Sequence, residues 1–86
     1  PMYKRVVLSN KQKFSSLLKY VRHRLSLSQE DIARDLGVSF ATVNRWENGK
    51  ASPSRLALAQ SDRFCEQMVS EKKLGRNDLK EGGISG

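Results

Sequence analysis

The sequence predicts an all-α fold, a compact domain of four or five helices built around two short helices that a tight turn connects. Apolar residues recur at intervals of three and four along the chain, and residues that cap or stop helices stand at the ends of these segments. The 86 residues suffice for one small domain. We expect this domain at residues 11–74, an N-terminal flexible arm at 1–10 and a flexible tail at 75–86.

The first predicted helix runs from Lys11 to about Leu25. Its apolar residues repeat at three and four, at Phe14, Leu17, Leu18, Val21 and Leu25. The opposite face carries the basic residues Lys11, Lys13, Lys19 and Arg24. An amphipathic helix buries its apolar stripe, so we expect this helix to pack across the two central helices and complete the core.

The first central helix is predicted to begin at Gln29. Ser28 is a good N-cap, and Asp31 three residues later can close a capping box. The apolar positions Ile32, Ala33 and Leu36 follow helical spacing. Gly37 supplies the left-handed residue that ends the helix. The turn between the two central helices is therefore expected at residues 37–39.

The second central helix is predicted from Phe40 to about Asn48, with Ser39 as its N-cap. Helical spacing turns Val43 and Trp46 inward. The same spacing places four residues on the outer side, namely Phe40, Ala41, Asn44 and Arg45. Gly49 is expected to end the helix.

A last helix is predicted to follow Ser52 and Pro53, which suit an N-cap and a first helical residue. It is expected to run to about Leu74 and to stop at Gly75. Its inner face fits Leu56, Ala59, Phe64 and Met68. The helix is long for the core of so small a domain, so its second half can pack on a partner chain. The residues after it show no clear pattern for a separate fifth helix.

The segment LSQEDIARDLGVS, followed by TVNRWENGKASP, resembles the helix-turn-helix of the phage repressor and Cro family, also called the XRE family. The matching positions are Gln29, Ala33, Gly37, Val43 and the run from Trp46 to Lys50. The resemblance covers roughly residues 14–64. It implies a lambda-repressor-like DNA-binding domain, usually a dimer on a two-fold operator, that regulates transcription and most often represses it.

The second central helix would then be the recognition helix in the major groove, which is about 12 Å wide. Arg45 can bond a guanine edge and Asn44 an adenine edge, while Ala41 and Phe40 can meet a thymine methyl. Phe40 can instead wedge toward the sugar-phosphate backbone or fold back onto the domain. The alternative for the whole face is an ordinary polar helix surface.

Contacts to the DNA backbone are expected from polar side chains at the helix ends. Gln29 stands at a helix N-terminus, where free N–H groups favour a phosphate, and the resemblance implies that it helps to orient the recognition helix. The turn after that helix offers further phosphate contacts. The full set of predicted backbone contacts is Gln29, Ser39, Thr42, Asn48, Lys50 and Arg55.

The resemblance also implies an ion pair between Arg22 and Glu47. It would hold the end of the recognition helix and the following loop against the first helix. The alternative is that both side chains are separately solvated.

The net charge of +7 lies entirely in residues 1–29, which hold seven basic and no acidic residues, whereas residues 30–86 balance at nine of each. This part of the surface would attract a polyanion such as DNA. A solvated basic helix is the plain alternative. Within residues 1–10, Lys4 and Arg5 of an arm could touch phosphates, although an added strand at a dimer contact is also open.

Other functional classes find little support. The single cysteine, Cys65, and the single histidine, His23, allow neither an internal disulfide nor a zinc site, and we expect no cofactor and no metal. We find no catalytic residues and expect no enzyme, since Glu30 and Asp31 suit a helix N-terminus without catalysis. No apolar run approaches a membrane span, so a cytoplasmic protein is expected.

Three functions remain open at this stage. The first is a sequence-specific transcription regulator that binds double-stranded DNA as a homodimer. The second is an antitoxin-type regulator that also binds a protein partner through its last helix and tail. The third is the DNA-targeting module of a larger restriction or modification protein.

Overall fold

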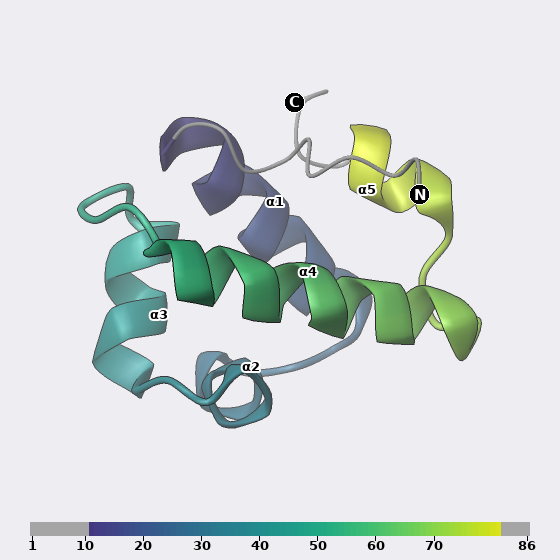
Figure 1. The fold of residues 1–86 in the computed structure, drawn as a ribbon, viewed down its shortest axis with the longest axis horizontal. Coiled ribbons are helices and arrows are strands. Elements are labelled where there is room, and N and C mark those ends of the chain that lie inside the picture. Colours follow the sequence, from purple (N-terminus) through teal and green to yellow (C-terminus); the bar gives the residue numbers. More distant parts are fainter. Residues whose placement is uncertain (1–10, 82–86) are drawn as a thin grey trace.

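The computed structural model describes residues 11–81, and the regular structure within that range is helical. The five helices are α1 (Lys11–Arg24), α2 (Gln29–Leu36), α3 (Phe40–Glu47), α4 (Arg55–Ser70) and α5 (Arg76–Glu81). Figure 1 shows α4 crossing in front of α1, with α2 below, α3 at one end and α5 at the other. The predicted all-α fold is confirmed. The predictions for residues 1–10 lie outside the described residues.

The core forms where α1 meets α2 and α3. Val21, Ile32 and Val43, one from each helix, are the largest side chains that are fully buried. The rings of Phe14 and Trp46 meet edge to face, with 5.3 Å between centroids and 87° between planes, an arrangement that aromatic pairs favour. The apolar stripe predicted for the first helix therefore packs as expected, and it fixes the position of α3.

The junctions of α2 and α3 follow the capping signals of the sequence. Ser28 Oγ accepts from the Asp31 N–H at 3.0 Å while the Asp31 carboxylate accepts from the Ser28 N–H at 2.9 Å, which completes the capping box. Gly37 has the left-handed φ of 74° that stops α2. Helix α3 ends at Glu47, one residue earlier than predicted, because Asn48 leaves helical geometry as the C-cap.

Helix α4 begins later than predicted. Its N-cap is Ser54, whose hydroxyl accepts from the Ala57 N–H at 3.1 Å, so the expectation of a cap at Ser52 was wrong. The predicted inner face was also wrong in part, since Leu56 is 67% exposed and Ala57 is buried. The physical reason is packing, because α4 places small residues, Ala57 and Ser61, against the core.

The end of α4 differs most from the sequence prediction. The helix stops at Ser70, and Lys72 takes a left-handed φ of 63°. The chain then forms α5 at residues 76–81, which is the fifth helix that a four- to five-helix fold allows, within the segment expected to be a flexible tail. Leu74 and Leu79 are both buried. Two apolar residues five positions apart are too weak a pattern to predict this helix, and their burial against the rest of the domain explains why it forms.

Candidate nucleic-acid interface

Helix α3 presents one face to solvent and buries the other. Val43 is fully buried and Trp46 is 4% exposed, so the helix is fixed against the core. On the outer side, Ala41 and Arg45 are exposed, and Phe40 is 49% exposed. The structure therefore leaves the predicted outer face open, and Phe40 does not fold back into the core.

The two polar residues of this face differ in their surroundings. Arg45 is exposed, and no acidic side chain among residues 14–79 forms an ion pair with it. Asn44 is half-buried, and its Nδ2 donates to Gln29 Oε1 at 3.1 Å. Arg45 can thus move to a ligand without breaking a contact, whereas Asn44 is already held.

The predicted backbone-contacting residues lie around the two ends of α3. At its start, Ser39 Oγ accepts from the Thr42 N–H at 3.1 Å and donates to Thr42 Oγ1 at 2.9 Å. At its end, Asn48 and Lys50 are exposed on either side of Gly49, which has a φ of 69°. Lys50 N–H donates to the Arg45 carbonyl at 2.9 Å and closes this turn.

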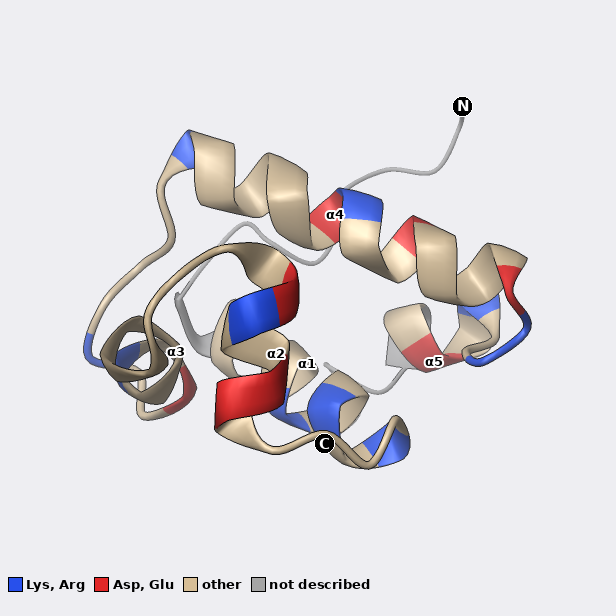
Figure 2. Cartoon of the chain, turned by 90° about the horizontal axis from the view of Figure 1, so that it is seen from below, with Lys and Arg blue, Asp and Glu red and all other residues tan. Residues whose placement is uncertain are grey.

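The basic residue Arg55 begins α4, four residues beyond this turn, and is exposed. Figure 2 shows basic positions on the turn after α3 and at the first turn of α4, while α2 and the middle of α4 carry acidic and basic positions together. The carboxylate at the end of α3, Glu47, is buried, whereas Lys50 and Arg55 are exposed, so the exposed charge of these three residues is positive. Such a surface favours a polyanion at the α3 end.

An ion pair joins Arg22 of α1 to Glu47 at the end of α3, as the sequence analysis expected. Arg22 Nε donates to Glu47 Oε2 at 2.7 Å and Nη2 donates to Oε1 at 2.8 Å, which is the forked geometry of strong guanidinium–carboxylate pairs. Arg22 Nη1 also donates to the Leu27 carbonyl at 3.1 Å. Ser15 Oγ donates to the Glu47 carbonyl at 2.7 Å. These contacts hold three segments of the chain together.

Glu47 is ionised in this setting although it is only 4% exposed. Burial by itself raises the pKa of Glu47, but the hydrogen bonds from Arg22 and Gln29 outweigh it, so that the pKa is lowered. The same pair raises the pKa of Arg22. A buried carboxylate with this many donors acts only as an acceptor.

A chain of side-chain amides leads from Glu47 to the outer face of α3. Gln29 Nε2 donates to Glu47 Oε1 at 3.0 Å, Asn44 Nδ2 donates to Gln29 Oε1 at 3.1 Å, and Asn48 Nδ2 donates to Asn44 Oδ1 at 3.1 Å. Sequence reasoning treated Gln29, Asn44 and Asn48 as separate contacts with DNA and missed these bonds. The spacing of Asn44, Glu47 and Asn48 at i, i+3 and i+4 was the available signal.

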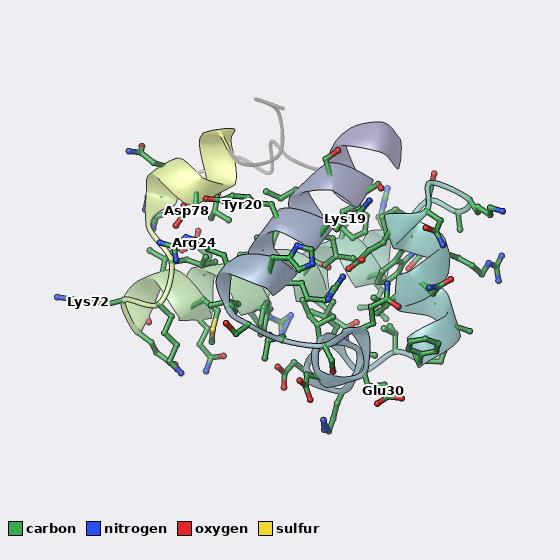
Figure 3. The ribbon with its side chains drawn as sticks, turned by 180° about the vertical axis from the view of Figure 1, so that it is seen from behind. Lys19, Tyr20, Arg24, Glu30, Lys72 and Asp78 are labelled. Carbon is green, nitrogen blue, oxygen red and sulfur yellow. The ribbon has the colours of Figure 1, made fainter. Side chains whose placement is uncertain are left out.

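A second polar cluster ties α5 to α1. Tyr20 Oη donates to Asp78 Oδ1 at 2.7 Å, and Arg24 Nε lies 3.6 Å from the same oxygen. Figure 3 shows these three side chains together where α1 and α5 meet, on the other side of the domain from Glu30 of α2. The Gly75 N–H also donates to Asp78, which with the Tyr20 bond lowers the pKa of Asp78, while the bond to Asp78 raises the pKa of Tyr20. Sequence reasoning did not single out this cluster.

Other kinds of site find little support in the described part of the chain. Within residues 11–81 no three metal-binding side chains come together, and no helix has the length and apolar character to cross a bilayer. Burial raises the pKa of the Cys65 thiol to about 12, with Asp62 and Glu66 adding to the effect, so the reactive thiolate is scarce at neutral pH.

One open hollow lies between α2 and α4, with a volume of about 200 Å³. Leu36 and Phe64 provide its apolar part, and its remaining lining is polar. Pockets for small ligands usually measure about 300–1,000 Å³ and enclose most of the ligand. This hollow is smaller and open, so α3 and its flanking turns remain the strongest candidate site.

Comparison with known proteins agrees with this choice. The family model described as helix-turn-helix matches residues 18–60, half of the chain. The chain is 38% identical over 55 residues to the type II methyltransferase M1.ScrFI of Lactococcus lactis subsp. cremoris. That match covers 60% of this chain and 14% of the methyltransferase, so the chain spans about one seventh of that relative's length. No solved structure matches.

Proposed function

This chain belongs to the XRE-type helix-turn-helix family of DNA-binding domains, and from that membership we propose that it is a sequence-specific regulator of transcription. It binds double-stranded DNA with α3 in the major groove and acts as a repressor by occupying its site. The remaining residues of the fold hold α3 and its flanking turns in the orientation that the groove requires.

The exposed position of Arg45 is the observation that carries this proposal. Its guanidinium stands on the outer face of α3 without an acidic partner among the described residues. Two parallel N–H donors match the O6 and N7 atoms of guanine, which is the commonest specific contact in the major groove. Phe40 and Ala41, exposed on the same helix, suit contact with a thymine methyl.

Phosphate contacts set the register of α3 on the duplex. Lys50 and Arg55 are exposed, and they flank the segment that joins α3 to α4. Ser39 and Thr42 stand at the other end of α3, and their paired hydroxyls can turn toward a phosphate. Asn48 adds a polar amide at the turn after α3. The +7 net charge of the chain supports this electrostatic part of binding.

We propose a homodimer as the binding form. One recognition helix reads few base pairs, and two helices about 34 Å apart read successive major grooves on one side of the duplex. The site is then an inverted repeat with half-site centres about ten base pairs apart.

The test is selection of bound sequences from a random duplex pool, followed by affinity measurements at near-physiological salt. We expect an inverted repeat to be enriched. Arg45→Ala should then cost about 1–3 kcal/mol of binding on that site and relax the choice at one base pair. Weakening of specific and random DNA by the same factor would contradict the role of Arg45 in reading bases.

Lys50→Ala is the matched control for a phosphate contact. It should weaken binding to all sequences about equally and lower the slope of log affinity against log salt by about 1. A change of sequence preference in Lys50→Ala would show that this side chain reads a base.

A second candidate is favoured by the match to the methyltransferase, whose length is mostly outside the matched segment. In this reading the domain is the DNA-targeting module of a larger modification protein. A module of that kind needs no second copy. Selection would then enrich a single half-site, and sedimentation of the complex would show one copy of the chain bound to each duplex. Enrichment of an inverted repeat together with a dimer on DNA contradicts the module reading.

A further inference from the structure

We propose that two copies of the chain exchange α5, so that the α5 of each copy packs against α1 and α4 of the other. The exchanged segment is residues 74–81, and residues 71–73 form the hinge. The inference rests on the proposed homodimer, for which it names the surface that joins the two copies and the segment that occupies it.

The hinge is strained at Lys72. Its φ of 63° lies in the left-handed region, which residues other than glycine seldom adopt. The turn is also tight, since the Met68 carbonyl accepts from the N–H groups of both Lys73 and Leu74, at 2.8 and 3.3 Å. A short hinge under strain favours exchange between copies, because opening the hinge relieves the strain.

The residues of the hinge are compatible with an open form. Glutamate and lysine are among the better helix formers, so α4 can continue through residues 71–73 once Lys72 leaves the left-handed region. The direction of the chain after Ser70 then changes, and α5 moves away from the rest of its own copy. The strain at Lys72 is therefore the cost of keeping α5 on its own copy.

Helix α5 can move as a unit but cannot stand alone. Asp78 Oδ2 accepts from the Gly75 N–H at 2.9 Å, and this bond lies entirely within the exchanged segment. The helix has six residues, fewer than the roughly 12–15 that an isolated helix needs in water. Leu79 and Leu74 are both buried, so a displaced α5 needs another apolar surface of the same kind.

The surface that α5 covers determines the partner. Tyr20 Oη donates to Asp78 Oδ1 at 2.7 Å, and Arg24 Nε lies 3.6 Å from the same oxygen, so this part of α1 suits a carboxylate. On α4, Glu66 suits a cation, because it accepts two bonds from Arg76 at 3.1 and 3.2 Å. A second copy of the chain supplies the cation, the carboxylate and the adjacent leucine in the required order.

The exchange leaves the proposed DNA-binding face of each copy open. Helix α5 lies at the opposite end of the fold from α3 (Figure 1), and its polar contacts are with α1 and α4. A reciprocal exchange gives a dimer that two-fold symmetry closes. An inverted repeat in DNA has the same symmetry.

The first test is complementation between two variants with reversed charge. Arg76→Glu and Glu66→Arg each place like charges at this contact. In an exchanged dimer only the mixed pair restores both contacts, so native mass spectrometry should show the mixed dimer favoured over the like dimers by about tenfold or more. The control is a chain with both substitutions, which restores the contact in every dimer and should dimerise as the native chain does.

The second test changes the strain in the hinge, with sedimentation equilibrium to measure the dissociation constant of the dimer. Lys72→Gly relieves the strain in the unexchanged form, so dimerisation in solution should weaken by about tenfold or more. Lys72→Val should strengthen it, because a β-branched residue tolerates a positive φ poorly. Lys73→Gly is the matched control, since it adds freedom to the hinge without relieving this strain, and it should have a much smaller effect.

The outcomes separate the exchange from the proposed function. If the mixed dimer forms no more often than random pairing gives, and Lys72→Gly dimerises as the native chain does, the exchange is wrong and the proposed homodimer stands. A native chain that is monomeric in solution, yet binds an inverted repeat as two copies, also contradicts the exchange alone. One copy of the chain on each duplex overturns both.

Discussion

The boundaries of α2 and α3 are set by capping residues that lie within a few positions of each helix. The arrangement of α4 and α5 depends instead on residues far away in the sequence. The capping box of Ser28 and Asp31 spans three positions. By contrast, the bond from Tyr20 to Asp78 that ties α5 to α1 spans 58 positions. The boundaries of α2 and α3 are therefore set by neighbouring residues, whereas the position of α5 is set by a contact across the fold.

Within residues 11–81, left-handed residues follow four helix ends, namely Ser26 (φ 58°) after α1, Gly37 and Gly49 after α2 and α3, and Lys72 after α4. Gly37 and Gly49 end α2 and α3 with φ values of 74° and 69°, which glycine adopts without strain. Lys72 ends α4 with a φ of 63°, where a side chain costs free energy. The chain holds this strained residue because α5 is fixed beyond it by Leu79 and Asp78. The two turns that end α2 and α3 are thus free of the side-chain strain that the turn after α4 carries.

The largest effect is expected from breaking the buried pair that fixes the motif to α1. Glu47→Ala removes the acceptors of two Arg22 N–H groups, and the charge stays largely buried because the side chain of Arg22 is only 14% exposed. Removal of one partner of such a pair costs about 3–5 kcal/mol of unfolding free energy. Urea denaturation followed by Trp46 fluorescence measures this loss.

Glu30→Ala is the matched control, since this carboxylate is exposed in the first turn of α2 and should have only a small effect. Native Glu47 has a lowered pKa, so its stabilising contribution is present above its ordinary value of 4.5 and is lost as the pH falls through the lowered pKa. The Glu47→Ala protein should lack this part of the acid transition. A loss below about 1 kcal/mol would contradict the central place of the pair.

A local effect is expected at alkaline pH, where the C-terminal half and the DNA-binding half should respond differently. The pKa of Tyr20 is raised by its hydrogen bond to Asp78, so this contact is intact below the ordinary value of 10.0 and is lost as the pH rises through the raised pKa. The resulting phenolate would face the Asp78 carboxylate. The pair of Arg22 and Glu47 stays charged throughout this range, so α5 should be released while α3 stays packed.

Methyl NMR resonances of Leu79 and Val43 report on the two halves in this experiment. We expect the Leu79 signal to move with the ionisation of Tyr20 and the Val43 signal to remain in place. In Tyr20→Phe the alkaline step at Leu79 should disappear. Simultaneous loss of both signals in the native protein would mean that α5 and the motif unfold as one unit.

These contrasts explain what the sequence could predict. The outer face of α3, including Arg45, followed from helical spacing and from the caps that fix where the helix begins. The start of α4 could not be predicted in this way, because Ser52 and Ser54 both suit an N-cap. The burial of Ala57 decides between them. The amide chain from Gln29 could not be predicted from spacing alone, because it needs α2 and α3 to meet in space.

The smallest effect is expected where α4 turns into α5. Lys72→Gly removes the cost of a side chain at a φ of 63°, roughly 1–2 kcal/mol, but it also gives the unfolded chain more freedom. The net gain in unfolding free energy should be about 0.5–1 kcal/mol. The side chain of Lys72 points away from the fold at this turn (Figure 3), so its removal breaks no packing.

Gly37→Ala is the inverse of this substitution within the motif. No atom lies within 4 Å of the position that the new Cβ would occupy, so its cost comes from the backbone at a φ of 74° alone. We expect a loss of about 1 kcal/mol in urea denaturation. Opposite signs for Lys72→Gly and Gly37→Ala would support the division between a strained C-terminal turn and a relaxed motif turn. A destabilised Lys72→Gly protein would instead indicate that the lysine side chain contributes to holding α5.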